Sequence, residues 1–209
     1  MSTRWLIFWA SLVVLTLPLP AFYSRSHRYR GLAELDIERR NGSWWLTWRQ
    51  VLRFPGHWIE LLRGLLAAWA LKATVDQLET VSSFYEVHAG WVRGVLPLAI
   101  ATLSVVLIAV LFRSPGKSLA PIFFVTSTLL VLVPLPVSLP ALLLGCVGMF
   151  ALKSLSAFFA TLVLPLALLG FLLDRNLWPS LAGAVFAATP LLFAFARHHE
   201  LVIPVRRTR

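Results

Sequence analysis

Long apolar runs, separated by short polar breaks, make up most of this chain. A helix needs about 20 apolar residues to cross roughly 30 Å of hydrocarbon. The runs predict seven membrane-spanning helices, at residues 5–22, 54–71, 91–112, 119–137, 139–152, 155–173 and 177–196. The second run is the weakest, because Glu60 and Arg63 lie within it, and the fifth is short. The first resembles a signal peptide, but Arg4 is its only basic flank and a strongly basic loop follows, which favours an uncleaved span.

Composition agrees with this pattern. Hydrophobic residues make up 58% of the 209 residues, charged residues make up 13%, and the mean hydropathy is +0.78. A soluble domain has no means of hiding so much apolar surface from water. We therefore predict an all-α, polytopic integral membrane bundle that forms a single domain over residues 1–209. The one cysteine, Cys146, lies in an apolar run and is interpreted as a packing residue.

The basic residues predict the orientation of the bundle, because Lys and Arg in short loops stay in the cytoplasm. With the N-terminus outside, fourteen of them face the cytoplasm: Arg25, Arg28, Arg30, Arg39, Arg40, Arg49, Arg53, Arg113, Lys117, Lys153, Arg197, Arg206, Arg207 and Arg209. The outer side then has four: Arg4, Lys72, Arg93 and Arg175. This asymmetry favours an N-out, C-in arrangement, which needs an odd number of spans.

The net charge of +10 needs no nucleic acid as a partner. Its basic residues are expected to face anionic lipid headgroups, where each contributes about 1 kcal/mol. Trp44, Trp45, Trp48 and Trp58 crowd the first basic loop and its junction with the second span. Tryptophan beside arginine is typical of segments at headgroup depth. Residues 23–53 are therefore predicted to lie partly on the cytoplasmic interface, with membrane lipids as partners.

Four polar groups fall on the predicted cytoplasmic side: residues 36–53, the pair Glu60 and Arg63, residues 113–117 and residues 197–200. Glu60 and Arg63 stand at i and i+3, so they share a helix face and can pair. Charges within a membrane helix are costly unless they pair or face a polar cavity. Two interpretations stay open, namely a functional site and an ion pair near the start of the helix.

Four stretches carry motif-like residues in a definite order: 42-GSWWLTWRQVLR-53, 60-ELLRG-64, 115-PGKSLAP-121 and 197-RHHEL-201. Their order, with all four on one membrane face, resembles PlsY, the family of acyl-phosphate-dependent glycerol-3-phosphate acyltransferases. In that family the matching motifs are a first loop with Gly-Ser-Gly-Asn-x-Gly-Ala-Thr-Asn-x-x-Arg, then Asp-x-x-Lys-Gly, Gly-Gly-Lys-Gly-Val-Ala-Thr and Arg-His-x-x-Asn. The resemblance covers the chain from about residue 36 to its C-terminus.

The resemblance implies a seven-helix protein of the bacterial inner membrane, with its site at the cytoplasmic face and no separate cofactor or metal. Acyl phosphate and glycerol 3-phosphate would be the substrates. The matching positions place Ser43, Lys117 and His198 in catalysis. The substrate phosphates would be bound by Gly42, Arg53, Arg63, Arg113, Gly116 and Arg197.

The chain departs from the family where a phosphate would need open backbone. Trp44, Thr47 and Trp48 stand where the family has small residues, and Pro115 and Ser118 stand where it has glycines. Bulky side chains obstruct backbone N–H groups, and a proline removes one N–H donor. Two functions of different class follow. One is a divergent acyltransferase. The other is a non-catalytic structural or accessory subunit of a larger membrane complex.

Two other kinds of site are disfavoured. The sequence 116-GKS-118 ends like a Walker A loop, but the earlier glycine of that motif is replaced by Leu111, within an apolar run. His198 and His199 with Glu200 suggest a metal, but neighbouring helical residues diverge by about 100° and rarely bind one ion together.

Overall fold

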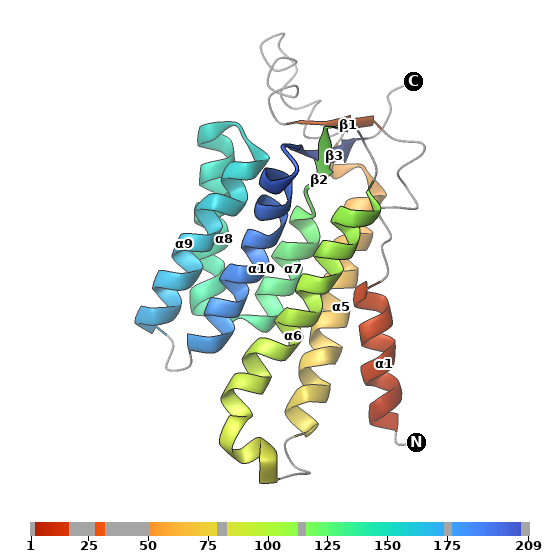
Figure 1. The fold of residues 1–209 in the computed structure, drawn as a ribbon, viewed down its shortest axis with the longest axis vertical. Helices are drawn as coiled ribbons and strands as arrows, with labels where there is room; N and C mark the ends of the chain where they lie inside the picture. The colour runs from red at the N-terminus through yellow and green to blue at the C-terminus, as the bar shows by residue number, and fades with distance from the viewer. Residues whose placement is uncertain are drawn as a thin grey trace.

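The computed structural model describes residues 3–16, 28–31, 51–78, 83–112, 116–173 and 177–205. Seven helices have described bounds: α1 (Thr3–Thr16), α5 (Pro55–Leu78), α6 (Ser83–Leu111), α7 (Ile122–Leu132), α8 (Leu135–Leu152), α9 (Leu155–Leu173) and α10 (Leu177–Ala196). Each predicted apolar run overlaps one of these helices, so the helical bundle is confirmed (Figure 1). Apolar run length therefore located each helix, although not its bounds.

Within the part of the chain that the structure describes, four helices are long and apolar enough to cross a membrane. They are Gly94–Leu111 within α6, and the whole of α8, α9 and α10. Their outward faces carry large exposed apolar side chains, such as Phe171 at 70% and Phe195 at 77% exposure. Soluble monomers rarely expose such continuous apolar surface. The chain is thus an integral membrane protein with its apolar faces turned outward.

The fourth predicted span, residues 119–137, is not one helix. Residues 117–119 form a strand, and α7 covers only Ile122–Leu132. Proline disfavours helical geometry in the residue before it, and Val133, directly before Pro134, is extended at φ −103° and ψ 141°. The boundary between the fourth and fifth segments therefore falls at Pro134, earlier than the predicted 137–139. At 1.5 Å per residue, α7 spans only about 16 Å.

Two helices, α5 and α6, extend beyond their apolar runs by seven or more residues. α5 continues from residue 71 to Leu78, and α6 begins at Ser83, ahead of the predicted start at residue 91. Hydropathy detects where a helix must avoid water, whereas backbone hydrogen bonding continues into polar sequence. The helices α5 and α6 are therefore longer than the predicted membrane spans, one of which ends at residue 71 and the other of which begins at residue 91.

A small sheet lies at one end of the bundle (Figure 1). It contains β1 (Arg28–Arg30), β2 (Lys117–Leu119) and β3 (Glu200–Val205), in the order β1-β3-β2. β3 pairs antiparallel with β1 and parallel with β2. The sequence analysis predicted no strand. The start of α1 lies at the other end of the bundle from this sheet (Figure 1).

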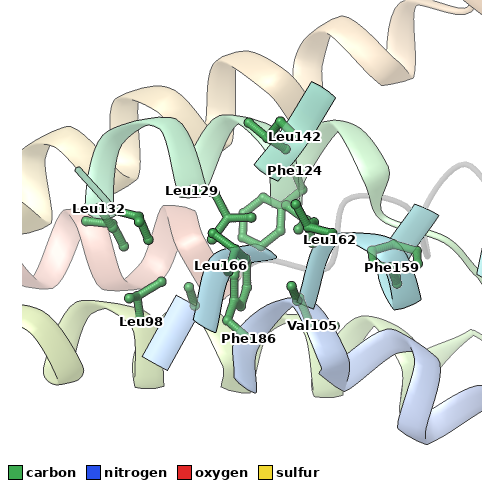
Figure 2. Close-up of a cluster of buried hydrophobic side chains, with 14 of the residues drawn as sticks. Leu98, Val105, Phe124, Leu129, Leu132, Leu142, Phe159, Leu162, Leu166 and Phe186 are labelled. Carbon is green, nitrogen blue, oxygen red and sulfur yellow. The ribbon is translucent and has the colours of Figure 1, made fainter. Parts of the chain in front are cut away.

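The apolar core is built around α7, which packs against α5, α8 and α10. Figure 2 shows side chains from five helices meeting there: Leu98, Val105, Phe124, Leu129, Leu132, Leu142, Phe159, Leu162, Leu166 and Phe186. The rings of Phe124 and Phe186 meet edge to face, with centroids 6.3 Å apart. A short helix at the centre can begin and end within the bundle because its neighbours cover it on several sides.

Candidate functional site

The sheet joins three segments that are far apart in sequence. Lys117 stands opposite Glu200 in the β2–β3 register, and Tyr29 stands opposite Pro204 in the β1–β3 register. The ladder extends past β2, since Glu200 N donates to Gly116 O at 3.0 Å and Ala120 N donates to Val202 O at 2.9 Å. The basic loop, the 115–121 stretch and the C-terminal tail therefore meet at one end of the molecule.

Gly116 and Lys117 open β2. Gly116 has φ +66°, a left-handed conformation that favours glycine, and a side chain there would meet no atom within 4 Å. Lys117 Nζ donates a hydrogen bond to the carbonyl oxygen of Tyr29 at 3.2 Å. The lysine thus ties the two outer strands together across the end of the sheet.

Arg197 and His198 form the C-terminal cap of α10. His198 has φ +54°, its N–H donates to Phe195 O at 3.1 Å, and the His199 N–H donates to Ala194 O at 2.9 Å. This pair of bonds is a Schellman motif, which satisfies carbonyl groups of the last turn. The Arg197 guanidinium lies 4.4 Å from the centre of the Phe193 ring. Both predicted site residues are exposed, and His198 occupies a position that usually takes glycine.

Arg63 is buried between three helices. Its Nη2 donates to Glu60 Oε2 at 2.6 Å, and its Nη1 donates to Leu15 O at 3.3 Å. Its guanidinium also lies 4.5 Å from the centre of the Phe124 ring. The arginine therefore links α5 to α1 and α7, and the predicted pairing of Glu60 with Arg63 at i and i+3 is confirmed, in a buried position.

The contact with Leu15 has an electrostatic reason. Leu15 lies in the last turn of α1, where carbonyl groups lack partners within the helix and the helix dipole is negative. α1 has no basic residue of its own in that turn, so the cation comes from α5. Lys72, farther along α5, makes a similar contact with the end of α7. Its Nζ donates a hydrogen bond at 3.1 Å to Val131 O, which lies in the last turn of α7.

Gly64 allows α5 and α7 to approach each other closely. A side chain at this position would collide with the Ser127 hydroxyl, and it would stand 3.1 Å from Phe124 O. The glycine of the 60-ELLRG-64 stretch therefore has a packing role directly beside the ion pair.

A pocket lies where the sheet meets the first turns of α5 and α7. It contains about 470 Å³ of space, part of it open to the surface. Its walls are Tyr29, Phe54, Gly56, His57, Glu60, Leu119, Ala120, Pro121, Ile122, Phe123, Phe124 and Pro204. These described lining residues include no lysine or arginine. All four predicted polar segments or their direct neighbours thus reach this end of the bundle, although the pocket itself is not cationic.

Three polar side chains line the pocket. His57 stacks on Phe123 with ring centres 4.5 Å apart, and its Nε2 lies 3.1 Å from Pro204 O. A carbonyl oxygen only accepts, so Nε2 carries the proton. Burial raises the pKa of the Tyr29 hydroxyl to about 12, which keeps it neutral and able to donate. Glu60 Oε2 is bound to Arg63, whereas Glu60 Oε1 is buried and has no hydrogen-bond partner among the described residues.

Of the remaining predicted site residues, three are not described and one is exposed. Gly42, Ser43 and Arg113 lie outside the described residues, as does most of the predicted interfacial loop. Arg53 is exposed in the turn before α5. The structure therefore brings Gly116 and Lys117 to the tail beyond Arg197 and His198, and it buries Arg63 in the bundle.

Some polar contacts at this end were not selected from the sequence. Ser118 Oγ lies 3.1 Å from His199 Nδ1, and these residues are 81 positions apart, so no local pattern indicates the contact. His57 did have a signal, because it stands three residues before Glu60 on the same face of α5. No group of three or more His, Cys, Asp or Glu in the described part is placed to hold a metal ion.

Comparison of the chain with protein-family models, with curated proteins and with solved structures found no match. The resemblance to PlsY therefore rests on the sequence motifs alone.

Proposed function

We propose that this protein is a non-catalytic accessory subunit of a complex in a bacterial inner membrane, built on a PlsY-like arrangement of seven spans. Its N-terminus lies outside and its sheet faces the cytoplasm. Two features support this orientation: the asymmetry of the basic residues, and the position of the sheet at the opposite end of the bundle from the start of α1 (Figure 1).

The observation that carries the proposal is how two of the predicted site cations, buried Arg63 and half-buried Lys117, are bound within the protein. Arg63 is bound to Glu60, to the end of α1 and to the Phe124 ring, and Lys117 is bound to the backbone of β1. A phosphate-binding role would require these groups to face a substrate. In addition, the described residues that line the pocket beside them include no lysine or arginine to bind a phosphate.

The test is isolation of the full chain from its own membranes in a mild detergent. We expect it to elute with one other membrane protein at a fixed ratio, and to make no product from acyl phosphate and glycerol 3-phosphate. Acylated glycerol 3-phosphate formed by the purified chain would contradict the proposal. A chain that elutes alone after gentle extraction would also contradict it.

A second candidate is the family reaction itself, in which an acyl chain passes from acyl phosphate to glycerol 3-phosphate. It is favoured by the exposed Gly116 turn, whose backbone is not covered, next to Lys117 and the tail that follows His198. The same assay with Lys117→Ala separates the candidates. Product that disappears in this variant, while the variant elutes as the original does, would establish the acyltransferase.

A further inference from the structure

We propose that the rim formed by the turn between α8 and α9 and by the end of α10 binds anionic phospholipids of the bilayer through Lys153 and Arg197. The ligand is a lipid with a phosphate and a net negative charge, such as phosphatidylglycerol. Among the basic residues predicted to face the cytoplasm, these two are distinguished by where their helices end. The rim differs from the substrate site that the resemblance assigns to Arg197, because its phosphate belongs to a bilayer lipid.

The two cations stand at the depth of lipid headgroups. α8 and α10 are each long and apolar enough to cross a membrane, and they end at Leu152 and Ala196. Lys153 and Arg197 are the next residues of the chain, and both are exposed. Both helices end at the sheet end of the bundle (Figure 1). A cation directly after a span lies where hydrocarbon gives way to headgroups, and an anionic lipid surface attracts it there.

Local structure fixes the position of each cation. Lys153 is the C-cap of α8 in a left-handed conformation, with φ 50° and ψ 38°, and its backbone N–H donates to Met149 O. The Arg197 guanidinium lies over the Phe193 ring, with its central carbon 4.4 Å from the ring centre. A guanidinium over a ring keeps its N–H donors in its own plane, where two of them can bind two phosphate oxygens.

Exposed apolar side chains beside the cations provide a surface for acyl chains. Leu152 precedes Lys153, and Phe195 lies two residues before Arg197; both are large, apolar and exposed. A phospholipid can therefore place its phosphate at the cation and its chains along the helix below. A soluble phosphate would contact the cation alone, so the rim favours a lipid over a free phosphate ion.

The test uses the full chain in phosphatidylcholine nanodiscs that contain a phosphatidylglycerol probe with its photoreactive group near the headgroup. The label should map to residues 150–156 and 192–198. Unlabelled phosphatidylglycerol should compete about fivefold better than phosphatidylcholine with the same chains, the fold-change for the roughly 1 kcal/mol of one near-surface cation. Inorganic phosphate should not compete. Equal competition by the two lipids, full competition by inorganic phosphate, or a label confined to other residues would each overturn the proposal.

Three variants that each remove one positive charge locate the site. Below saturation of the probe, Lys153→Gln should lower the label at residues 150–156 about fivefold, and Arg197→Gln should do the same at residues 192–198. Arg53→Gln removes an exposed cation just before α5, which packs mainly against α1 and α7, and should leave both labels unchanged.

Two results with these variants would overturn the proposal. One is an undiminished label in a folded Lys153→Gln or Arg197→Gln chain. The other is an equal loss of label in Arg53→Gln, which would mean that net charge alone attracts the lipid. The competition series on the original chain decides the question if a variant does not fold.

Discussion

At the scale of single residues, two cationic side chains of α5, buried Arg63 and exposed Lys72, act on the ends of neighbouring helices. Arg63 satisfies a terminal carbonyl of α1, and Lys72 satisfies one of α7. In each case a cation from α5 replaces a basic residue that the neighbouring helix lacks in its own last turn. The Glu60–Arg63 pair therefore orders three helices.

This arrangement predicts a strong asymmetry between single and double substitutions. Arg63→Ala leaves the Glu60 carboxylate buried without its partner and should lower the free energy of unfolding by about 3–5 kcal/mol. Replacing both residues, with Glu60→Leu and Arg63→Met, should restore most of that loss. The measurement is thermal unfolding in detergent, with exposed Arg53→Ala as a control that changes stability by less than about 0.5 kcal/mol. A double variant as unstable as Arg63→Ala would refute the ion-pair account.

The left-handed position at His198 gives a second prediction. A residue with a side chain pays about 1–2 kcal/mol in this conformation, and glycine does not. After the extra entropy that glycine loses on folding, His198→Gly should raise stability by roughly 0.5–1 kcal/mol, which is a few degrees in melting temperature. His199→Gly, which removes the contact with Ser118, should lower it. A destabilised His198→Gly chain would show that the imidazole makes contacts that outweigh backbone strain.

At the scale of elements, β3 is the central strand of the sheet, so both outer strands depend on it. A chain that ends at His199 lacks β3, whereas a chain that ends at Val205 keeps it. We expect only the shorter chain to lose amide protection at Ala120, whose N–H donates to Val202 O, and in residues 28–31. Hydrogen exchange measures this directly. Equal protection of Ala120 in the two chains would mean that β2 is held by the helices and not by β3.

At the scale of the whole molecule, the proposed topology has opposite ends on opposite sides of the membrane. A reporter joined ahead of α1 should be active only outside the cytoplasm, and one joined after Val205 only inside it. The reason is the excess of Lys and Arg on the loops at the sheet end. If the two fusions report the same compartment, the proposed number of spans is wrong.

From the sequence alone, the helices could be located approximately and the membrane character could be recognised, whereas seven membrane spans stay a prediction. Both follow from apolar run length, because transfer of side chains from water to hydrocarbon is a property of local composition. The Glu60–Arg63 contact was also within reach, since residues at i and i+3 meet on any helix. The break at Pro134 was visible in principle, but the apolar run across it concealed the stop of α7.

Only the tertiary structure decided the sheet and the pocket. β1 pairs with a tail more than 170 residues later, and the Ser118–His199 contact also joins distant segments. Strands of three to six residues carry too little periodicity to be recognised, and the pairing of such strands depends on which helix ends lie together. The same holds for Arg63: its sequence indicated a charge within the membrane, whereas the neighbouring α1 terminus and the Phe124 ring determined what that charge binds.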